Sequence, residues 1–288
     1  MIGPEALAIT YGLGSAITWG AGDFSAGFAS RKSGVVSVVL FSQLIGAGFL
    51  FFLAMFFSGP LPSLLDMAFG GLAGVFGVLG LIALYEGLSR GRMGIVAPLS
   101  AIVTAMIPIG FAFFKEGLPN VPQIIGLALA LASVWLLSYS KNKEKKYRFT
   151  EFTLPLLSGI GFGLFFILID AATQESLLWP LVGTRCVSLL MMSILFLASS
   201  NARVPTKSQL PFIALAGLCD ILGNMFFALA TNLGRLDISA MLSSLFPAAT
   251  ISLAWFFLKE KLNRYQWIGV AVALAALILI SAKPIKES

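Results

Sequence analysis

Apolar runs of about 20 residues follow one another along most of the chain, and they limit its possible folds more than any other feature. A helix of this length crosses the roughly 30 Å of hydrocarbon in a bilayer. Only 11% of the 288 residues are charged, against about 25% in soluble domains, which is too few to cover a water-soluble globule. The sequence therefore predicts an all-α integral membrane protein.

Ten such runs lie between polar, proline or basic interruptions. The first five are expected at Ala6–Ala29, Val35–Phe57, Leu65–Leu88, Gly94–Phe114 and Pro122–Ser140. The second five are expected at Thr153–Thr173, Trp179–Ser199, Pro211–Leu233, Ile238–Leu258 and Asn263–Ala282. This spacing predicts a first five-helix unit at 1–140, a basic cytoplasmic linker at 141–152 and a second unit at 153–288.

The two units are similar in sequence. Gly12 and Asp23 in the first run match Gly159 and Asp170 in the sixth at the same offset of 147 residues. Because each unit has an odd number of helices, the second must enter the membrane in the opposite sense. We therefore expect ten transmembrane helices in two inverted five-helix repeats around a central cavity, an arrangement typical of transporters that work by alternating access.

Basic residues are unevenly distributed between the two expected faces. Fourteen of the 19 Lys and Arg residues follow the first, third, fifth, seventh and ninth runs. The positive-inside rule places that face in the cytoplasm and both termini outside, in a multi-pass protein of the cell inner membrane. The net charge of +6 is thus explained by orientation in lipid and does not indicate nucleic-acid binding.

Several kinds of chemistry are excluded or disfavoured. The chain has no histidine, which excludes imidazole metal sites and histidine-based catalysis. It has no Walker-type phosphate loop, so ATP is not expected to drive it directly. We expect no cofactor, no metal and no enzymatic activity. Cys186 and Cys219 lie inside apolar runs and are expected to be buried thiols.

A longer pattern in the last two runs resembles a known family. It comprises Ser239-Ala-Met-Leu-Ser-Ser-Leu-Phe-Pro-Ala-Ala-Thr250, Phe257-Leu-Lys-Glu-Lys-Leu262 and Tyr265-Gln-Trp-Ile-Gly269, with a weaker first copy around Ile95–Ser100 and Phe114–Leu118. This is similar to the drug/metabolite transporter superfamily, in its EamA-like branch. The resemblance implies ten spans around a cavity and usually export or exchange. It also implies cytoplasmic termini in many members, so two orientations stay open.

Prolines inside the fourth and ninth runs mark expected points of gating or kinking. They are Pro98, Pro108 and Pro247. Because these runs correspond in the two repeats, a transporter is expected to place its site beside such interrupted helices. The nearby hydroxyls of Ser100, Ser243 and Ser244 are expected to bind substrate there, or to bond back to their own helix carbonyls.

Ionisable side chains inside the runs are the strongest site predictions, because they are costly in hydrocarbon. Asp220 lies near the middle of the eighth run, and Asn224 follows one turn later on the same face. Trp19 lies one turn before Asp23, where its ring could stack on a ligand or cover a cation. Together with Tyr85, these residues are predicted to bind substrate, the alternative being structural hydrogen bonds.

Asp170 and Arg185 lie near the same face on consecutive antiparallel runs. We predict an ion pair between them, the alternative being that Arg185 receives an anionic group of the substrate.

The function predicted from these features is secondary-active transport of a small metabolite, such as an amino acid, an amine or a drug-like compound, by a monomer. Proton coupling would have to use a carboxylate such as Asp220 or Asp23, and a facilitator or exchanger without protons is equally allowed. The alternative is an intramembrane aspartyl enzyme, because Gly20-Ala-Gly-Asp23 has the Gly-x-Gly-Asp form. That chemistry needs a second aspartate close by.

Overall fold

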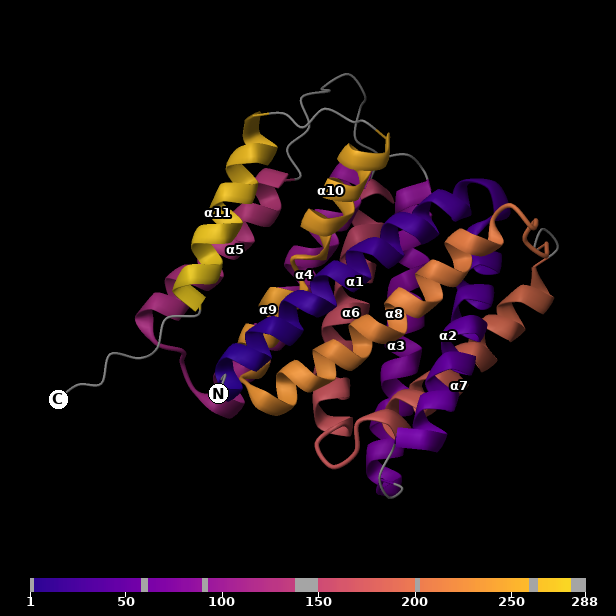
Figure 1. Cartoon of the computed structure of the whole chain (residues 1–288), viewed down its shortest axis with the longest axis horizontal. Coiled ribbons are helices and arrows are strands. Elements are labelled where there is room, and N and C mark those ends of the chain that lie inside the picture. The colour runs from indigo at the N-terminus through magenta and orange to yellow at the C-terminus, as the bar shows by residue number, and fades with distance from the viewer. Residues whose placement is uncertain are drawn as a thin grey trace.

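The computed structural model describes residues 3–57, 62–89, 93–137, 150–199, 203–258 and 264–280. All regular structure in these residues is helical (Figure 1). The helices are α1 (Pro4–Ser33), α2 (Val35–Phe57), α3 (Leu64–Ser89), α4 (Met93–Glu116), α5 (Val121–Leu137), α6 (Thr150–Ala172), α7 (Leu178–Ala198), α8 (Leu210–Leu233), α9 (Leu236–Ser243), α10 (Phe246–Leu258) and α11 (Arg264–Ile280). Of the expected linker, residues 141–149 lie outside the described residues.

Five of the described helices, α2, α3, α6, α7 and α8, are long and apolar enough to cross a membrane. Shorter apolar segments at Leu99–Lys115 and Val121–Leu136 lie in α4 and α5. The 30 residues of α1 extend about 45 Å at about 1.5 Å per residue. The all-helical membrane fold is confirmed, whereas a total of ten spans stays a prediction.

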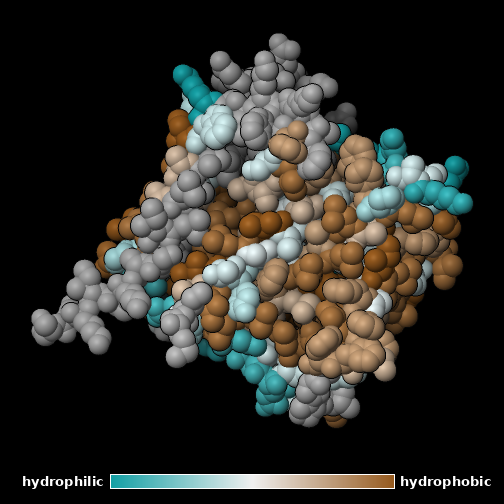
Figure 2. Space-filling model, in the orientation of Figure 1, coloured by the Kyte–Doolittle hydropathy of each residue, from teal (hydrophilic) through white to brown (hydrophobic). Residues whose placement is uncertain are grey.

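Apolar side chains cover much of the visible surface (Figure 2). In that view brown residues extend across the middle of the molecule, and teal residues gather toward its edges. Large side chains on the outer faces are strongly exposed, such as Ile17 at 63%, Phe56 at 67% and Leu190 at 63%. Soluble proteins rarely expose continuous apolar surface on this scale, so this surface fits contact with lipid.

Close contacts at glycines give the directions of the helices. Gly14 lies against Phe226 and Gly22 against Cys219, so α1 and α8 are antiparallel. The corresponding helices of the other repeat, α6 and α3, are also antiparallel, with Gly77 against Phe165 and Gly80 against Phe162. The first helix of each repeat thus packs antiparallel against the third helix of the other repeat.

A second pair of contacts also joins corresponding helices of the two repeats. Gly74 of α3 approaches the carbonyl of Thr184 on α7, and Gly217 of α8 approaches the carbonyl of Ser42 on α2, so closely that a Cβ could not fit at either glycine. α3 and α7 are parallel, while α2 and α3 lie side by side across a six-residue connection and run oppositely. α7 therefore runs opposite to its counterpart α2, as an inverted repeat requires.

The last helix of each repeat lies at one side of the bundle. α5 and α11 pack on each other there, as the magenta and yellow pair in Figure 1 shows. The cavity described below is lined by eight of the other nine described helices, all except α9.

The expected ninth span is two helices. α9 ends at Ser243 and α10 begins at Phe246. Pro247 explains the break, because proline has no N–H and its ring clashes with the carbonyl four residues earlier, which belongs to Ser243. In contrast, α4 continues as a helix through Pro98 and Pro108. Among the described residues, only the second repeat has a break between helices at this position, and kinking at Pro98 or Pro108 stays a prediction.

Candidate functional site

A cavity lies between the two repeats. Its wall comes from eight helices of both repeats and comprises Trp19, Asp23, Gln43, Gly74, Gly77, Val78, Leu81, Thr104, Phe162, Phe165, Phe166, Thr184, Arg185, Ser188, Asp220, Asn224 and Phe246. Seven of these 17 residues are aliphatic or aromatic, eight are polar or charged, and two are glycines.

Arg185 of α7 is the centre of a buried polar network. Its Nη1 donates to the Oε1 of Gln43 on α2, and its Nη2 pairs with the carboxylate of Asp220 on α8. Ser188 donates to the same Gln43 oxygen at 3.1 Å. The Arg185 side chain is 5% exposed, and its Nε has no partner among the described residues. The network therefore connects one helix of the first repeat with two of the second.

Asp23 of α1 is a second carboxylate on the cavity wall. It is 7% exposed, and the hydroxyl of Tyr85 on α3 hydrogen-bonds to it. In the part of the chain that the structure describes, Asp23 forms no ion pair with a lysine or arginine. A buried carboxylate without a paired cation is energetically costly, which makes Asp23 a candidate site residue.

Aromatic rings form the wall next to Asn224. The Trp19 ring stacks on Phe166 with centroids 5.3 Å apart, and its Nε1 donates to Oδ1 of Asn224 at 3.2 Å. Phe166 in turn stacks on Phe227, with centroids 4.1 Å apart. Gly223 leaves room for the indole ring of Trp19, because a Cβ at that position would collide with it. Both phenylalanines lie six residues before the ends of α6 and α8.

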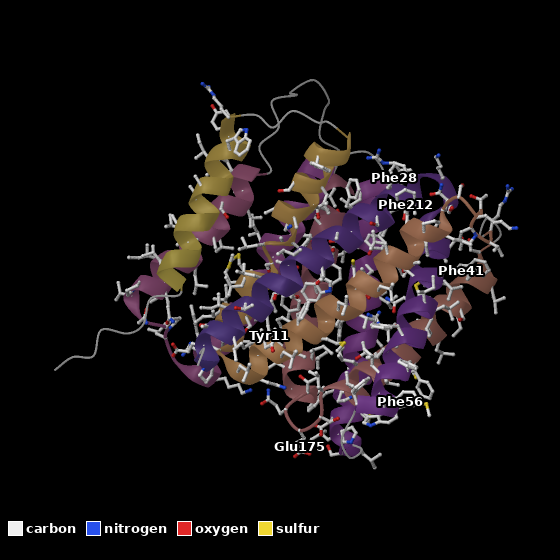
Figure 3. The ribbon with its side chains drawn as sticks, in the orientation of Figure 1. Tyr11, Phe28, Phe41, Phe56, Glu175 and Phe212 are labelled. Atoms are coloured by element: carbon white, nitrogen blue, oxygen red, sulfur yellow. The ribbon has the colours of Figure 1, made fainter. Side chains whose placement is uncertain are left out.

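Polar contacts join the two repeats at the end of the bundle where α1 begins, here called the Pro4 end. Lys115, at the end of α4, lies 3.5 Å from the Asp170 carboxylate, at the end of α6. Thr231 of α8 hydrogen-bonds to the same carboxylate, and Gln174 donates to it at 3.2 Å. Glu175, labelled in Figure 3, marks this end, and Phe28 and Phe212 mark the other.

Arg235 adds a second connection at the Pro4 end. Its guanidinium pairs with the buried carboxylate of Asp237 at 2.9 Å and donates to the carbonyl of Gly117 at 2.7 Å. Gly117 belongs to the first repeat and Arg235 to the second. The contacts made by Lys115 and Arg235 are together called the end tie below.

The predicted ion pair between Asp170 and Arg185 is wrong. Asp170 pairs with Lys115 and Arg185 with Asp220. The reason is the packing of α6 and α7, which contact other helices far more than each other. α7 is placed against α2 and α3, which brings Arg185 to the cavity, while Asp170 stays at the Pro4 end.

The structure brings half of the predicted substrate residues together in the cavity wall: Trp19, Asp23, Asp220 and Asn224. The other four are buried but do not line it. Tyr85 is hydrogen-bonded to Asp23, Ser100 donates to Ser158 at 2.8 Å, and Ser243 donates to the Gly12 carbonyl at 3.4 Å. The Ser244 hydroxyl is buried without a partner among the described residues.

Of the predicted gating prolines, the side chain of Pro98 lies outside the described residues, and Pro247 is the second residue of α10. Pro108 lacks an N–H, so the carbonyl of Thr104 loses its usual helical donor. The Thr104 side chain lines the cavity, and its hydroxyl has no partner among the described residues. Both cysteines are free, but Cys186 is exposed, contrary to expectation, and only Cys219 is buried.

Sequence reasoning missed Gln43, Thr184 and Ser188. A signal was available for Gln43, which is an amide inside a mostly apolar run, eight residues after its first residue, Val35. Buried amides need partners as charged groups do, so a search restricted to ionisable residues overlooked it.

The geometry also bears on the predicted aspartyl enzyme. Asp23 and Asp220 do line the same cavity. Asp220, however, is paired with Arg185, whereas an aspartyl dyad shares a proton between its two carboxylates. The pairing gives this alternative no support.

Residues 6–139 and 150–282 each match the EamA-like transporter family. The chain belongs to this family. It is part of the drug/metabolite transporter superfamily, whose members are transporters rather than enzymes. The EamA-like chain is accordingly a multi-pass membrane protein, and its family indicates transport of small solutes.

A solved structure and a curated protein are also similar to this chain. A solved structure titled "Crystal structure of protein" superposes with a TM-score of 0.78, covering 95% of this chain and 98% of the other at 12% identity, and this shows the fold alone. "Uncharacterized protein MJ1333.1" of Methanocaldococcus jannaschii is 25% identical over 132 residues, which cover 46% of this EamA-like chain and 96% of that protein. That relative therefore has the length of one repeat.

Proposed function

We propose that this protein is a secondary-active transporter that exports or exchanges a small organic solute by alternating access around the cavity. The observation that carries the proposal is the position of the cavity between two oppositely directed repeats, with a buried charge network in its wall. Transporters with inverted repeats bind substrate at the repeat interface near the bilayer midplane. Asp220 lies close to the middle of the 24 residues of α8, which fits that depth.

The end tie supports a state that is closed at the Pro4 end. Lys115 and Gly117 of the first repeat hold Asp170 and Arg235 of the second. Along α8, the stacked Phe227 lies between Asp220 and this end. Opening the cavity toward the Pro4 end would require these contacts to separate. We propose that their breaking and re-forming is one half of the transport cycle.

The interrupted helices give the repeats a means to move. α9 and α10 are joined only by Ser244 and Leu245, and Pro108 weakens α4 beside the cavity. We propose a gating role for Pro108 and Pro247. If transport is coupled to protons, Asp23 is the better proton site, because Asp220 is already paired with Arg185. In this proposal the protein has ten spans, lies in the cell inner membrane and acts as a monomer, since one chain supplies both repeats.

Counterflow in proteoliposomes tests transport directly. Vesicles containing purified protein are loaded with a panel of amino acids, amines and drug-like compounds, and entry of each labelled solute is followed. We expect at least one compound to exchange faster than in protein-free vesicles. The same exchange should fall at least about tenfold in Asp220→Asn, because Arg185 then loses its buried partner. No exchange above that of protein-free vesicles for any class would refute the proposal.

A further inference from the structure

The charges on the cavity wall do not balance. Among the described residues that line it, Arg185 is the only cation, while Asp23 and Asp220 are both carboxylates. Arg185 uses one terminal nitrogen for Gln43 and the other for Asp220. The positive charge of Arg185 is already compensated by the Asp220 carboxylate. An anionic substrate would also meet the like charges of Asp23 and Asp220. The wall therefore disfavours anions.

Asp23 has unused capacity to bind a cation. An ionised carboxylate can accept about four hydrogen bonds, and Tyr85 supplies one. Asp23 is 7% exposed and lines the cavity, so water compensates little of its charge. A positive group that enters the cavity can pair with Asp23 without breaking any contact of Arg185.

The aromatic side chains next to Asp23 suit the same kind of group. Trp19 lies one turn before Asp23 on α1, and its ring lines the cavity with Phe162, Phe165 and Phe246. The faces of aromatic rings carry negative electrostatic potential and attract ammonium groups, most strongly in a site shielded from water. The same rings offer apolar surface to the rest of the ligand.

We infer that the cavity selects monovalent organic cations with an aromatic or apolar body, and that Asp23 receives their positive group. This inference rests on the proposed transport function and narrows its substrate class. It places amines and quaternary ammonium compounds above amino acids and organic anions. Asp220 contributes indirectly in this arrangement, by holding Arg185 away from the ligand.

A matched series of probes tests the inference on one aromatic body. The probes are 2-phenylethylammonium, benzyltrimethylammonium, phenylalanine, 3-phenylpropanoate and the neutral 2-phenylethanol. Binding to the detergent-solubilised full chain is measured by isothermal titration. We expect both cations to bind at least about tenfold more tightly than the zwitterion, the anion or the alcohol. Only the cations can pair with Asp23 without bringing a further carboxylate next to Asp23 and Asp220.

Variants of Asp23 test whether its carboxylate receives the positive group. Asp23→Asn should weaken binding of both cations at least about tenfold, with little effect on the alcohol. Asp23→Glu should restore part of the affinity because it keeps the charge. Glu175→Gln is the matched control, since it removes an exposed carboxylate at the Pro4 end, outside the cavity. If Asp23→Asn fails to fold, the relative affinities of the unmodified protein for the five probes still test whether the cavity selects cations.

The outcomes separate the substrate class from transport itself. Tighter binding of phenylalanine or 3-phenylpropanoate, or equal binding of all five probes, would overturn the inference, and so would binding of none. The proposed transport function would be unaffected by these results, because counterflow of other solutes measures it separately. Cation binding that is unchanged in a folded Asp23→Asn would also overturn the assignment of Asp23.

Discussion

Arg185 has two buried partners, and this makes its removal more harmful than removal of the whole pair. Arg185→Met leaves Asp220 with an uncompensated charge and Gln43 without its donor. Breaking a buried ion pair from one side costs about 3–5 kcal/mol, whereas replacing both members by apolar residues is often nearly neutral. We expect Arg185→Met to lower the apparent unfolding temperature in detergent, and Arg185→Met with Asp220→Leu to recover most of the loss.

The single Asp220→Leu variant completes the cycle, and the coupling free energy between the two sites should be at least about 2 kcal/mol. Additive effects of the two single substitutions would show that the guanidinium and the carboxylate do not depend on each other.

Sequence depth alone placed two polar side chains at the cavity, although their role in substrate binding stays a prediction. Asp220 and Asn224 share a helical face in the middle of a run, and both line the cavity. Prediction from sequence failed for Arg185 because its partner depends on which helices pack together. Consecutive helices are often neighbours, but α6 and α7 are both placed mainly against α3. No local pattern contains that information.

At the scale of helices, two glycines set the closest approaches between the repeats. A Cβ at Gly74 or Gly217 would collide with a backbone carbonyl of the facing helix. Because backbone cannot move aside as a side chain can, we expect Gly74→Ala and Gly217→Ala each to destabilise the protein by about 1–3 kcal/mol. Thermal unfolding in detergent measures the loss.

Gly48→Ala is the control for helix propensity, because nothing lies within 4 Å of a Cβ at that position on α2. Alanine there should stabilise by about 0.5–1 kcal/mol, since glycine is the poorer helix former. Equal effects at Gly48 and Gly74 would contradict the role given to the close contact.

Helix boundaries were largely predictable from sequence, because apolar runs end at polar residues, glycine or proline. The split of α9 from α10 was predictable only in part. Pro108 and Pro247 both lie inside apolar runs, yet only Pro247 ends a helix. Proline weakens a helix at a known place, but the surrounding packing decides whether the helix continues through it.

Pro108 provides a test of helix gating. Pro108→Ala restores the N–H that can bond to the Thr104 carbonyl and should stabilise α4 by up to about 3 kcal/mol. If bending at this point is part of the transport cycle, we expect the counterflow rate to fall while the unfolding temperature stays the same or rises. Pro211→Ala is the control, because that proline lies in the first turn of α8, where an N–H is not needed. An unchanged transport rate in Pro108→Ala would contradict gating.

At the scale of the whole molecule, the end tie predicts that locking the Pro4 end stops transport. In a background without Cys186 and Cys219, cysteines replace Lys115 and Asp170, whose side chains meet at 3.5 Å. Joining them with a reducible bifunctional maleimide should abolish counterflow, and reduction should restore it. The reason is that the two repeats can then no longer separate at this end.

The matched control joins cysteines at Ser63 and Asp66, which also contact each other near one end of the bundle but belong to one repeat. Counterflow should survive that link. Transport that continues with Lys115 and Asp170 positions fully joined would exclude opening at the Pro4 end.

Charge asymmetry also predicts which end faces the cytoplasm. Arg31 and Lys32 in the last turn of α1, and Arg203 and Lys207 before α8, lie at the end opposite Pro4, which the positive-inside rule assigns to the cytoplasm. In spheroplasts, an impermeant maleimide should label Glu175→Cys and should not label Lys207→Cys until the membrane is opened. Both side chains are exposed, so access alone decides the result. The reverse pattern would place both termini inside.

The matching contacts of the two repeats have a consequence for how the site could become asymmetric. Two identical five-helix subunits would carry the same residue at both related positions, so neither could change alone. A single polypeptide removes that restriction. Asp23 and Asp170 correspond in sequence, yet one lies in the cavity wall and the other pairs with Lys115. Because both repeats lie in one polypeptide, Asp23 and Asp170 can change independently. One can serve the proposed ligand site, and the other can serve the contacts that close the Pro4 end.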